Sequence, residues 1–102
     1  MALQDEQYWI DQELGQAALE CLKPSWDVAE LVVELGQGGT KVSLQPIGAS
    51  GVGMPSDAVF EAVGKLAKLH RDYATDLQKA KYAFQRRPDG KWSFEADFEY
   101  AP

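Results

Sequence analysis

The segment WSFEADFEY, residues 92–100, alternates apolar side chains with polar, mostly acidic ones. An alternation with a period of two is typical of a strand that buries one of its faces. The inward set is Trp92, Phe94, Ala96, Phe98 and Tyr100, and the outward set is Ser93, Glu95, Asp97 and Glu99. Such a strand requires a sheet with one covered face and one open face.

A partner strand is predicted at residues 79–87, KAKYAFQRR, with a three-residue loop at Pro88-Asp89-Gly90 between the two. This loop sets Phe84 opposite Phe94, Tyr82 opposite Ala96 and Ala80 opposite Phe98 on the inner face. On the outer face it sets Lys81 opposite Asp97 and Lys79 opposite Glu99. Pairs of opposite charge across strands contribute about 0.2–1 kcal/mol each. Glu95 faces Ala83 and therefore lacks a directly opposed cation.

An earlier hairpin is predicted from AELVVEL (29–35) and TKVSLQPI (40–47), with a two-residue turn at Gly38-Gly39. Its register pairs Leu35 with Val42, Val33 with Leu44 and Leu31 with Pro46, so that apolar side chains meet. The same register leaves Glu30 opposite Ile47 and Glu34 opposite Ser43, again without a cation. Pro46 cannot donate to a ladder, which indicates that its strand lies at an edge or ends there.

Two helices complete the predicted elements, the first at residues 4–22 and the second from Ser56 to Leu77. In the first, Leu3, Ile10, Leu14, Ala17 and Cys21 share one side, and Pro24 and Ser25 end it. In the second, Ser56 is the N-cap, and the apolar positions at helical spacing are Val59, Val63, Leu66, His70, Tyr73 and Leu77. The order α-β-β-α-β-β predicts an α+β two-layer sandwich, with a four-stranded, mainly antiparallel sheet and both helices on one face.

The length and charge of the chain limit the class of protein. A length of 102 residues indicates one compact domain, residues 1–102. A formal net charge of −6 argues against nucleic-acid binding, which needs a basic surface, and favours either a basic partner or no charged partner at all. Cys21 is the single cysteine, so an intramolecular disulfide cannot form. The sequence shows neither a membrane span nor a signal peptide, so we expect a cytoplasmic protein with no membrane partner.

No residues form a recognisable catalytic constellation, such as a nucleophile beside a base. His70 is interpreted as a helix-face or core-edge residue, and Cys21 as a small buried hydrophobe. GASGVG (48–53) is interpreted as a loop, because it lacks the Lys-Ser/Thr of a phosphate-binding loop. The scattered carboxylates show no metal-ligand spacing. We therefore expect a protein that is not an enzyme and has no catalytic residues, metal or cofactor.

Trp9 falls on the polar side of the first predicted helix, among Gln12, Glu13, Gln16 and Glu20. An exposed Trp surrounded by polar residues is a common interface anchor, although packing of Trp9 on its own domain is an equal alternative. Trp26, just before the first strand, is predicted to be a packing residue. Together with the unopposed carboxylates of the open sheet face, the candidate partner-binding residues are Glu30, Glu34, Glu95 and Trp9.

Three motifs in this order resemble the YezG-like antitoxin or immunity family: LKPSWD (22–27), VELGQGGTKVSLQP (33–46) and D-G-K-W-x-F-x-x-D-F-x-Y (89–100). The resemblance spans nearly the whole chain, and the last motif is its most specific part. It implies a small bacterial cytosolic protein that binds and neutralises a cognate toxin domain, typically a nuclease. The resemblance supplies no toxin-contact residues.

Two alternatives stay open at this point. One is a non-catalytic adaptor that binds a peptide strand at a sheet edge, beside Pro46 or Tyr100. The other is a small enzyme that uses a carboxylate with His70. An exposed edge strand and a spare Trp also leave a homodimer open.

Overall fold

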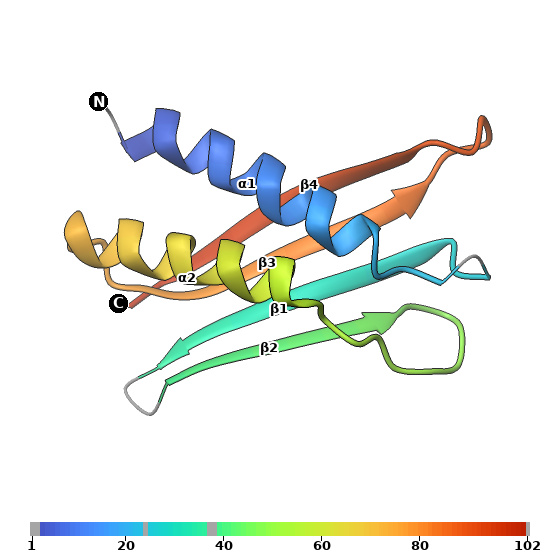
Figure 1. Ribbon diagram of the computed structural model, residues 1–102, viewed down its shortest axis with the longest axis horizontal. Helices are drawn as coiled ribbons and strands as arrows, with labels where there is room; N and C mark the ends of the chain where they lie inside the picture. The colour runs from blue at the N-terminus through green and yellow to red at the C-terminus, as the bar shows by residue number, and fades with distance from the viewer. Residues whose placement is uncertain (1–2, 24, 37–38, 102) are drawn as a thin grey trace.

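The computed structural model describes residues 3–23, 25–36 and 39–101, and it has two layers (Figure 1). Helices α1 (Leu3–Leu19) and α2 (Asp57–Asp72) lie on one face of a four-stranded sheet. The strands are β1 (Val28–Gly36), β2 (Gly39–Pro46), β3 (Leu77–Arg86) and β4 (Trp92–Tyr100). The predicted α+β class, the order of elements and the antiparallel sheet are confirmed.

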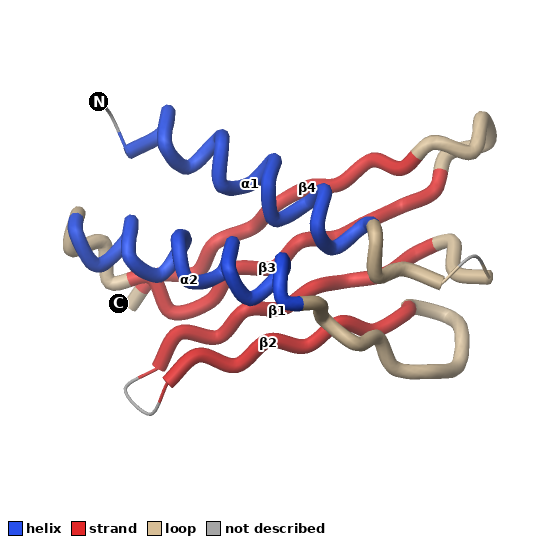
Figure 2. The backbone as a smooth tube through the Cα atoms, viewed as in Figure 1, coloured by secondary structure: helices blue, strands red, loops and turns tan. Residues whose placement is uncertain are grey.

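The strands run in the order β2-β1-β3-β4, and each neighbouring pair is antiparallel. Figure 2 shows this sheet behind the two helices. The order follows from the pairing of β1 with β3, which joins the two hairpins and which neither hairpin could predict alone. It makes β2 and β4 the edge strands. Pro46 is the last residue of the edge strand β2, so both consequences predicted for it hold.

The register of the β3–β4 hairpin is the predicted one, with Phe84 opposite Phe94 and Lys81 opposite Asp97. The Arg87 amide donates to the Lys91 carbonyl at 2.7 Å, and the Gly90 amide donates to the Arg87 carbonyl at 2.9 Å. These two bonds close the three-residue loop that the sequence predicted. Gly90 takes a φ of 86°, the left-handed conformation that suits glycine.

The predicted register of the first hairpin is wrong by two residues. Leu31 lies opposite Leu44, Val33 opposite Val42 and Gly36 opposite Gly39. Gly39 therefore belongs to β2, and the other predicted turn residue, Gly38, lies outside the described residues. A slip of two residues keeps every side chain on its face, so the hydrophobic pattern could not distinguish the two registers.

Both helices end earlier than predicted. Helix α1 ends at Leu19 instead of residue 22, and the predicted stop at Pro24 lies outside the described residues. Helix α2 begins as predicted, with the Ser56 hydroxyl accepting from the Val59 amide at 3.4 Å. It ends at Asp72 with Tyr73 as its C-cap, and Leu77 is a buried residue of β3.

The core lies between the helices and the inner sheet face. Its largest fully buried side chains are Trp26, Tyr82 and Phe84, so the prediction that Trp26 packs inside is confirmed. Cys21 is half-buried at the border of this core. Gly15 of α1 lies so close to β4 that an added Cβ would come within 2.6 Å of the Phe94 ring. Glycine at this position lets α1 approach the edge strand.

Candidate functional site

The open sheet face carries the predicted carboxylates Glu30, Glu34 and Glu95, but lysines lie beside the first two. Glu30 lies opposite Gln45, not Ile47, and its carboxylate lies 3.3 Å from the Lys81 ammonium. The premise of an unneutralised Glu30 is therefore wrong. It fails because Lys81 comes from β3, whose place beside β1 the sequence did not predict.

Glu34 is likewise flanked by basic residues. It lies opposite Lys41 of β2 and opposite Lys79 of β3, not opposite Ser43. The displaced register accounts for Lys41, and the pairing of β1 with β3 accounts for Lys79. The middle of the open face therefore alternates acidic and basic side chains and carries little net charge.

The carboxylates of β4 have fewer cationic partners than Glu30 and Glu34. Glu95 lies opposite Ala83, as the sequence predicted. Asp97 lies opposite Lys81, but the described ion pair of Lys81 is with Glu30. Lys79 and Glu99 are 4.0 Å apart, at the limit of an ion pair. Within the part of the chain that the structure describes, no ion pair holds Glu95 or Asp97, so an acidic row follows the sheet edge.

Trp9 lies on the helical layer, away from the open face. Its side chain is 67% exposed, so the alternative in which it packs into its own domain is wrong. Trp9 instead contacts Tyr8, itself 56% exposed, edge to face with ring centroids 5.2 Å apart. Since the open sheet face lies on the other side of the molecule, the four predicted contact residues do not form one surface.

Helix α1 concentrates the negative charge of the chain. Residues 1–22 contain five acidic and no basic residues, which leaves eleven acidic against ten basic residues in the remainder. The carboxylates of α1 and the turn after it are Asp5, Glu6, Asp11, Glu13 and Glu20. Only Glu13 forms a described ion pair, with Lys65 of α2 at 2.8 Å. Asp5, Glu13 and Glu20 are exposed, whereas Glu6 accepts a hydrogen bond from the Tyr73 hydroxyl at 3.0 Å. The outer side of α1 and of the turn after it therefore carries exposed carboxylates and no basic residue.

Helix α1 also turns two polar side chains inward, where the sequence predicted only apolar ones. The Asp11 carboxylate accepts from the Tyr82 hydroxyl and from the Gln7 amide nitrogen, each at 2.6 Å. The Gln7 side-chain oxygen accepts from His70 Nε2, and His70 Nδ1 lies 2.7 Å from the Thr75 hydroxyl. We call this chain of five residues the interior polar chain. Gln7 and Asp11 share helical spacing with the buried Leu14, the signal that could have identified them.

Burial sets the direction of each pKa shift in the interior polar chain. It raises the pKa of Asp11, against the hydrogen bonds from Tyr82 and Gln7, which lower it. It lowers the pKa of His70, although the nearby Asp11 charge opposes this. Burial and the bond to Asp11 both raise the pKa of Tyr82. The chain therefore favours a neutral His70 that donates through Nε2 and accepts at Nδ1.

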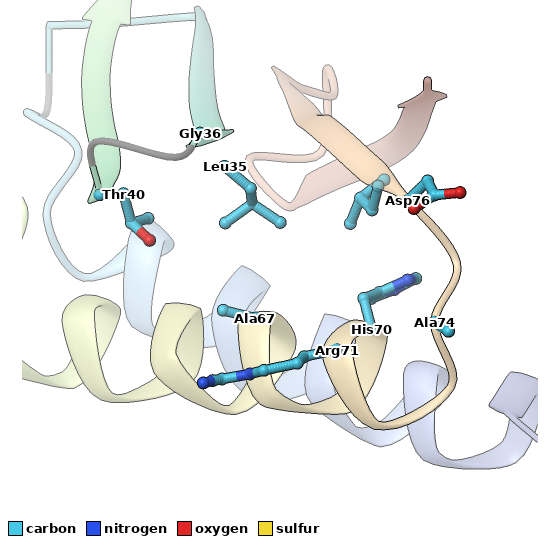
Figure 3. Close-up of a pocket in the computed structure, with 10 residues that line it drawn as sticks. Leu35, Gly36, Thr40, Ala67, His70, Arg71, Ala74 and Asp76 are labelled. Carbon is cyan, nitrogen blue, oxygen red and sulfur yellow. The ribbon is translucent and has the colours of Figure 1, made fainter. Parts of the chain in front are cut away.

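A pocket of about 500 Å³ opens between the end of the β1–β2 hairpin and the end of α2 (Figure 3). Leu35 and Thr40 project into it from the strands, and Ala67 and His70 face it from α2. His70 is itself buried, and both of its ring nitrogens already have partners. Among the pocket residues described, no nucleophile lies beside a free base, which is the arrangement that catalysis needs.

Comparisons with known proteins do not assign the chain to a family. No family model matches it, and no curated protein matches it either. The resemblance to YezG-like immunity proteins therefore stays a prediction. Over residues 3–23, 25–36 and 39–101, no three His, Cys, Asp or Glu side chains are grouped closely enough to hold a metal ion. None of the described helices has the length and apolar content needed to cross a membrane.

Proposed function

We propose that this chain is a non-catalytic immunity or antitoxin protein that binds and neutralises a basic toxin domain, a nuclease in the case we favour. The observation that carries the proposal is the one-sided charge of α1 and the turn after it, which have no basic residue and expose the carboxylates of Asp5, Glu13 and Glu20. A nuclease needs a positive cleft to hold its substrate, and an acidic protein surface can cover such a cleft. The family resemblance supports the same function.

Two contacts follow from the surface of α1. The exposed carboxylates attract the basic partner and accelerate the encounter. Trp9, which stands out from the same helix, provides apolar contact area once the two proteins meet. Glu95 adds charge at the sheet edge. Glu30 and Glu34 remain proposed contacts, but we expect smaller effects there because lysines already flank them.

The test uses the purified chain and the basic nuclease domain that it is proposed to retain from its native cytosol, with association followed by stopped flow at low and moderate salt. A charge-reversed variant, Asp5→Lys with Glu20→Lys, changes two exposed carboxylates that take part in no described ion pair. We expect association at low salt to slow by about tenfold or more, with a weaker dependence on salt. The matched control, Glu61→Lys with Asp72→Lys, makes the same charge change on α2 and should retain most of the rate.

Trp9→Ala removes the proposed apolar contact without changing the charge of α1, so it separates the two contributions to binding. We expect the association rate to stay near that of the unmodified chain and dissociation to accelerate, with a loss of about 2 kcal/mol, or about thirtyfold in Kd. If the charge-reversed variant and Trp9→Ala both bind and neutralise the toxin like the unmodified chain, the surface of α1 is not the interface.

A further inference from the structure

Strand β4 presents a full row of unpaired backbone groups to the outside of the sheet. It is a terminal strand, nine residues long, with β3 on one side only. The Arg87–Lys91 bond fixes which residues bond to β3, because bonded and non-bonded pairs alternate along an antiparallel ladder. The amides of Phe94, Ala96 and Phe98 therefore point away from β3, toward the open edge.

The two faces of this edge differ in chemistry. The outer face carries the acidic row of Glu95, Asp97 and Glu99. The inner face carries half-buried aromatic rings, Phe94 and Phe98, and the exposed Tyr100. An added strand would need basic residues on one face and apolar residues on the other.

Helix α1 extends the aromatic side of the edge. Gly15 contacts the Phe94 ring, and Tyr8, which lies two helical turns before Gly15, projects from the same side of α1. The N-terminal half of α1 lies, in the view of Figure 1, on the side of β4 away from β3. An added strand would therefore place its apolar side chains on the side of α1 from which Tyr8 projects.

The charge pattern disfavours a second copy of this chain as the occupant. In an antiparallel pairing of two β4 strands centred on Ala96, Glu95 of each copy would lie opposite Asp97 of the other. Like charges directly opposite each other destabilise a sheet. Strand β3 is the contrasting example, since it places Lys81 and Lys79 opposite Asp97 and Glu99.

We propose that β4 accepts an extended strand of a basic protein, in which Lys or Arg alternates with apolar residues, as a fifth strand of the sheet. The proposal rests on the proposed function for the source of that strand, the toxin domain, and it assigns the edge of β4 as a contact. Backbone hydrogen bonds would supply the pairing, and the alternation of charge would fix which face is outward.

A synthetic peptide in which lysine and valine alternate tests this chemistry without the toxin. We expect its addition to slow amide hydrogen exchange of Phe94, Ala96 and Phe98 by about tenfold or more, as measured by NMR. A peptide that alternates glutamate and valine should not slow it, and neither should a lysine–valine peptide with a central proline. Protection that appears without peptide and increases with protein concentration would indicate a second copy instead and overturn the proposal.

Two variants keep the test independent of folding defects. Ala96→Pro removes an outward donor at an edge position where proline is tolerated, and Asp97→Lys reverses a charge on the outer face. Both should reduce peptide binding by about tenfold, whereas Glu61→Lys on α2 should bind normally. Equal binding of the lysine and glutamate peptides, or shifts confined to other elements, would overturn the edge proposal and leave the proposed function standing. A chain that binds the lysine peptide but does not neutralise the toxin would support the edge proposal and contradict the proposed function.

Discussion

At the scale of single residues, Asp11 shows how the molecule accommodates a carboxylate between its layers. Two donors, the Tyr82 hydroxyl and the Gln7 amide, meet the same carboxylate oxygen. A buried acceptor that loses a donor costs more than an average hydrogen bond contributes, because its desolvation is no longer compensated. The interior polar chain is therefore a sensitive point of the fold.

Tyr82→Phe tests this point. The variant keeps the ring but removes the donor to Asp11, so we expect the free energy of unfolding to fall by about 1–3 kcal/mol in urea titrations. Tyr100→Phe is the matched control, since that residue is exposed and the change should be close to neutral. A Tyr82→Phe protein as stable as the unmodified one would show that the hydroxyl is not needed to hold Asp11.

Gly15 of α1 and Gly64 of α2 are helical glycines in opposite surroundings, so alanine substitutions at the two positions can be compared. Alanine is favoured over glycine within a helix by about 1 kcal/mol, so Gly64→Ala in α2, where an added Cβ meets nothing within 4 Å, should stabilise the protein. Gly15→Ala should destabilise it by about 1–3 kcal/mol despite the same gain, because its Cβ would overlap the Phe94 ring. Thermal unfolding of both variants gives the comparison, and two changes of the same sign would contradict the close contact of α1 with β4.

At the scale of elements, the two hairpins show what local sequence can and cannot predict. Pro88, Asp89 and Gly90 specify one loop, so the β3–β4 register was predicted correctly. Gly36, Gly38 and Gly39 allow more than one turn, and a slip of two residues preserves the hydrophobic pattern. No Gly or Pro lies between His70 and Lys79, so the apolar spacing predicted that the helix continues to Leu77. The helix in fact ends at Asp72, and in the turn that follows Ala74 and Asp76 take positive φ values of 51° and 60°.

The interior polar chain also couples the elements to pH, because it joins α1, α2 and β3. His70 is the only histidine of the chain, and burial lowers its pKa from 6.5. As the pH falls below 6.5, the unfolded chain takes up a proton before the folded protein does, so this part of the stability is lost in that window. Asp11 acts with the opposite sign, since its raised pKa lessens the cost of burial as the pH falls toward 3.8.

His70→Asn should therefore flatten the pH dependence. We expect the unmodified chain to lose stability between neutral pH and values below 6.5, and the variant to lose less over the same interval. Urea titrations at several pH values measure both slopes, and NMR titration of the single imidazole reports its pKa directly. Equal slopes in the two proteins, or a pKa at or above 6.5, would contradict a buried, neutral His70.

At the scale of the whole molecule, the sequence predicted which single residues are exposed better than it predicted the charges beside them. Alternation placed Glu95 on the open face, where it lies exposed. Helical projection placed Trp9 on the polar side of its helix and left packing on its own domain open, and the structure shows Trp9 exposed. Glu30 and Glu34 were misjudged because cross-sheet neighbours depend on strand order, which long-range packing decides. The absence of basic residues before Lys23 is visible in the sequence as a charge asymmetry. Only the structure shows which of these carboxylates are exposed and that Tyr8 and Trp9 form a pair on the same helix.

The central proposal is tested most directly by isolating the basic nuclease domain that the tagged chain is proposed to retain from its native cytosol, and by following its nuclease activity while the purified chain is titrated in. We expect activity to disappear near one molecule of this chain per toxin molecule, and the complex to weaken as salt rises. Full nuclease activity in the presence of excess folded chain at low salt would contradict the proposed function.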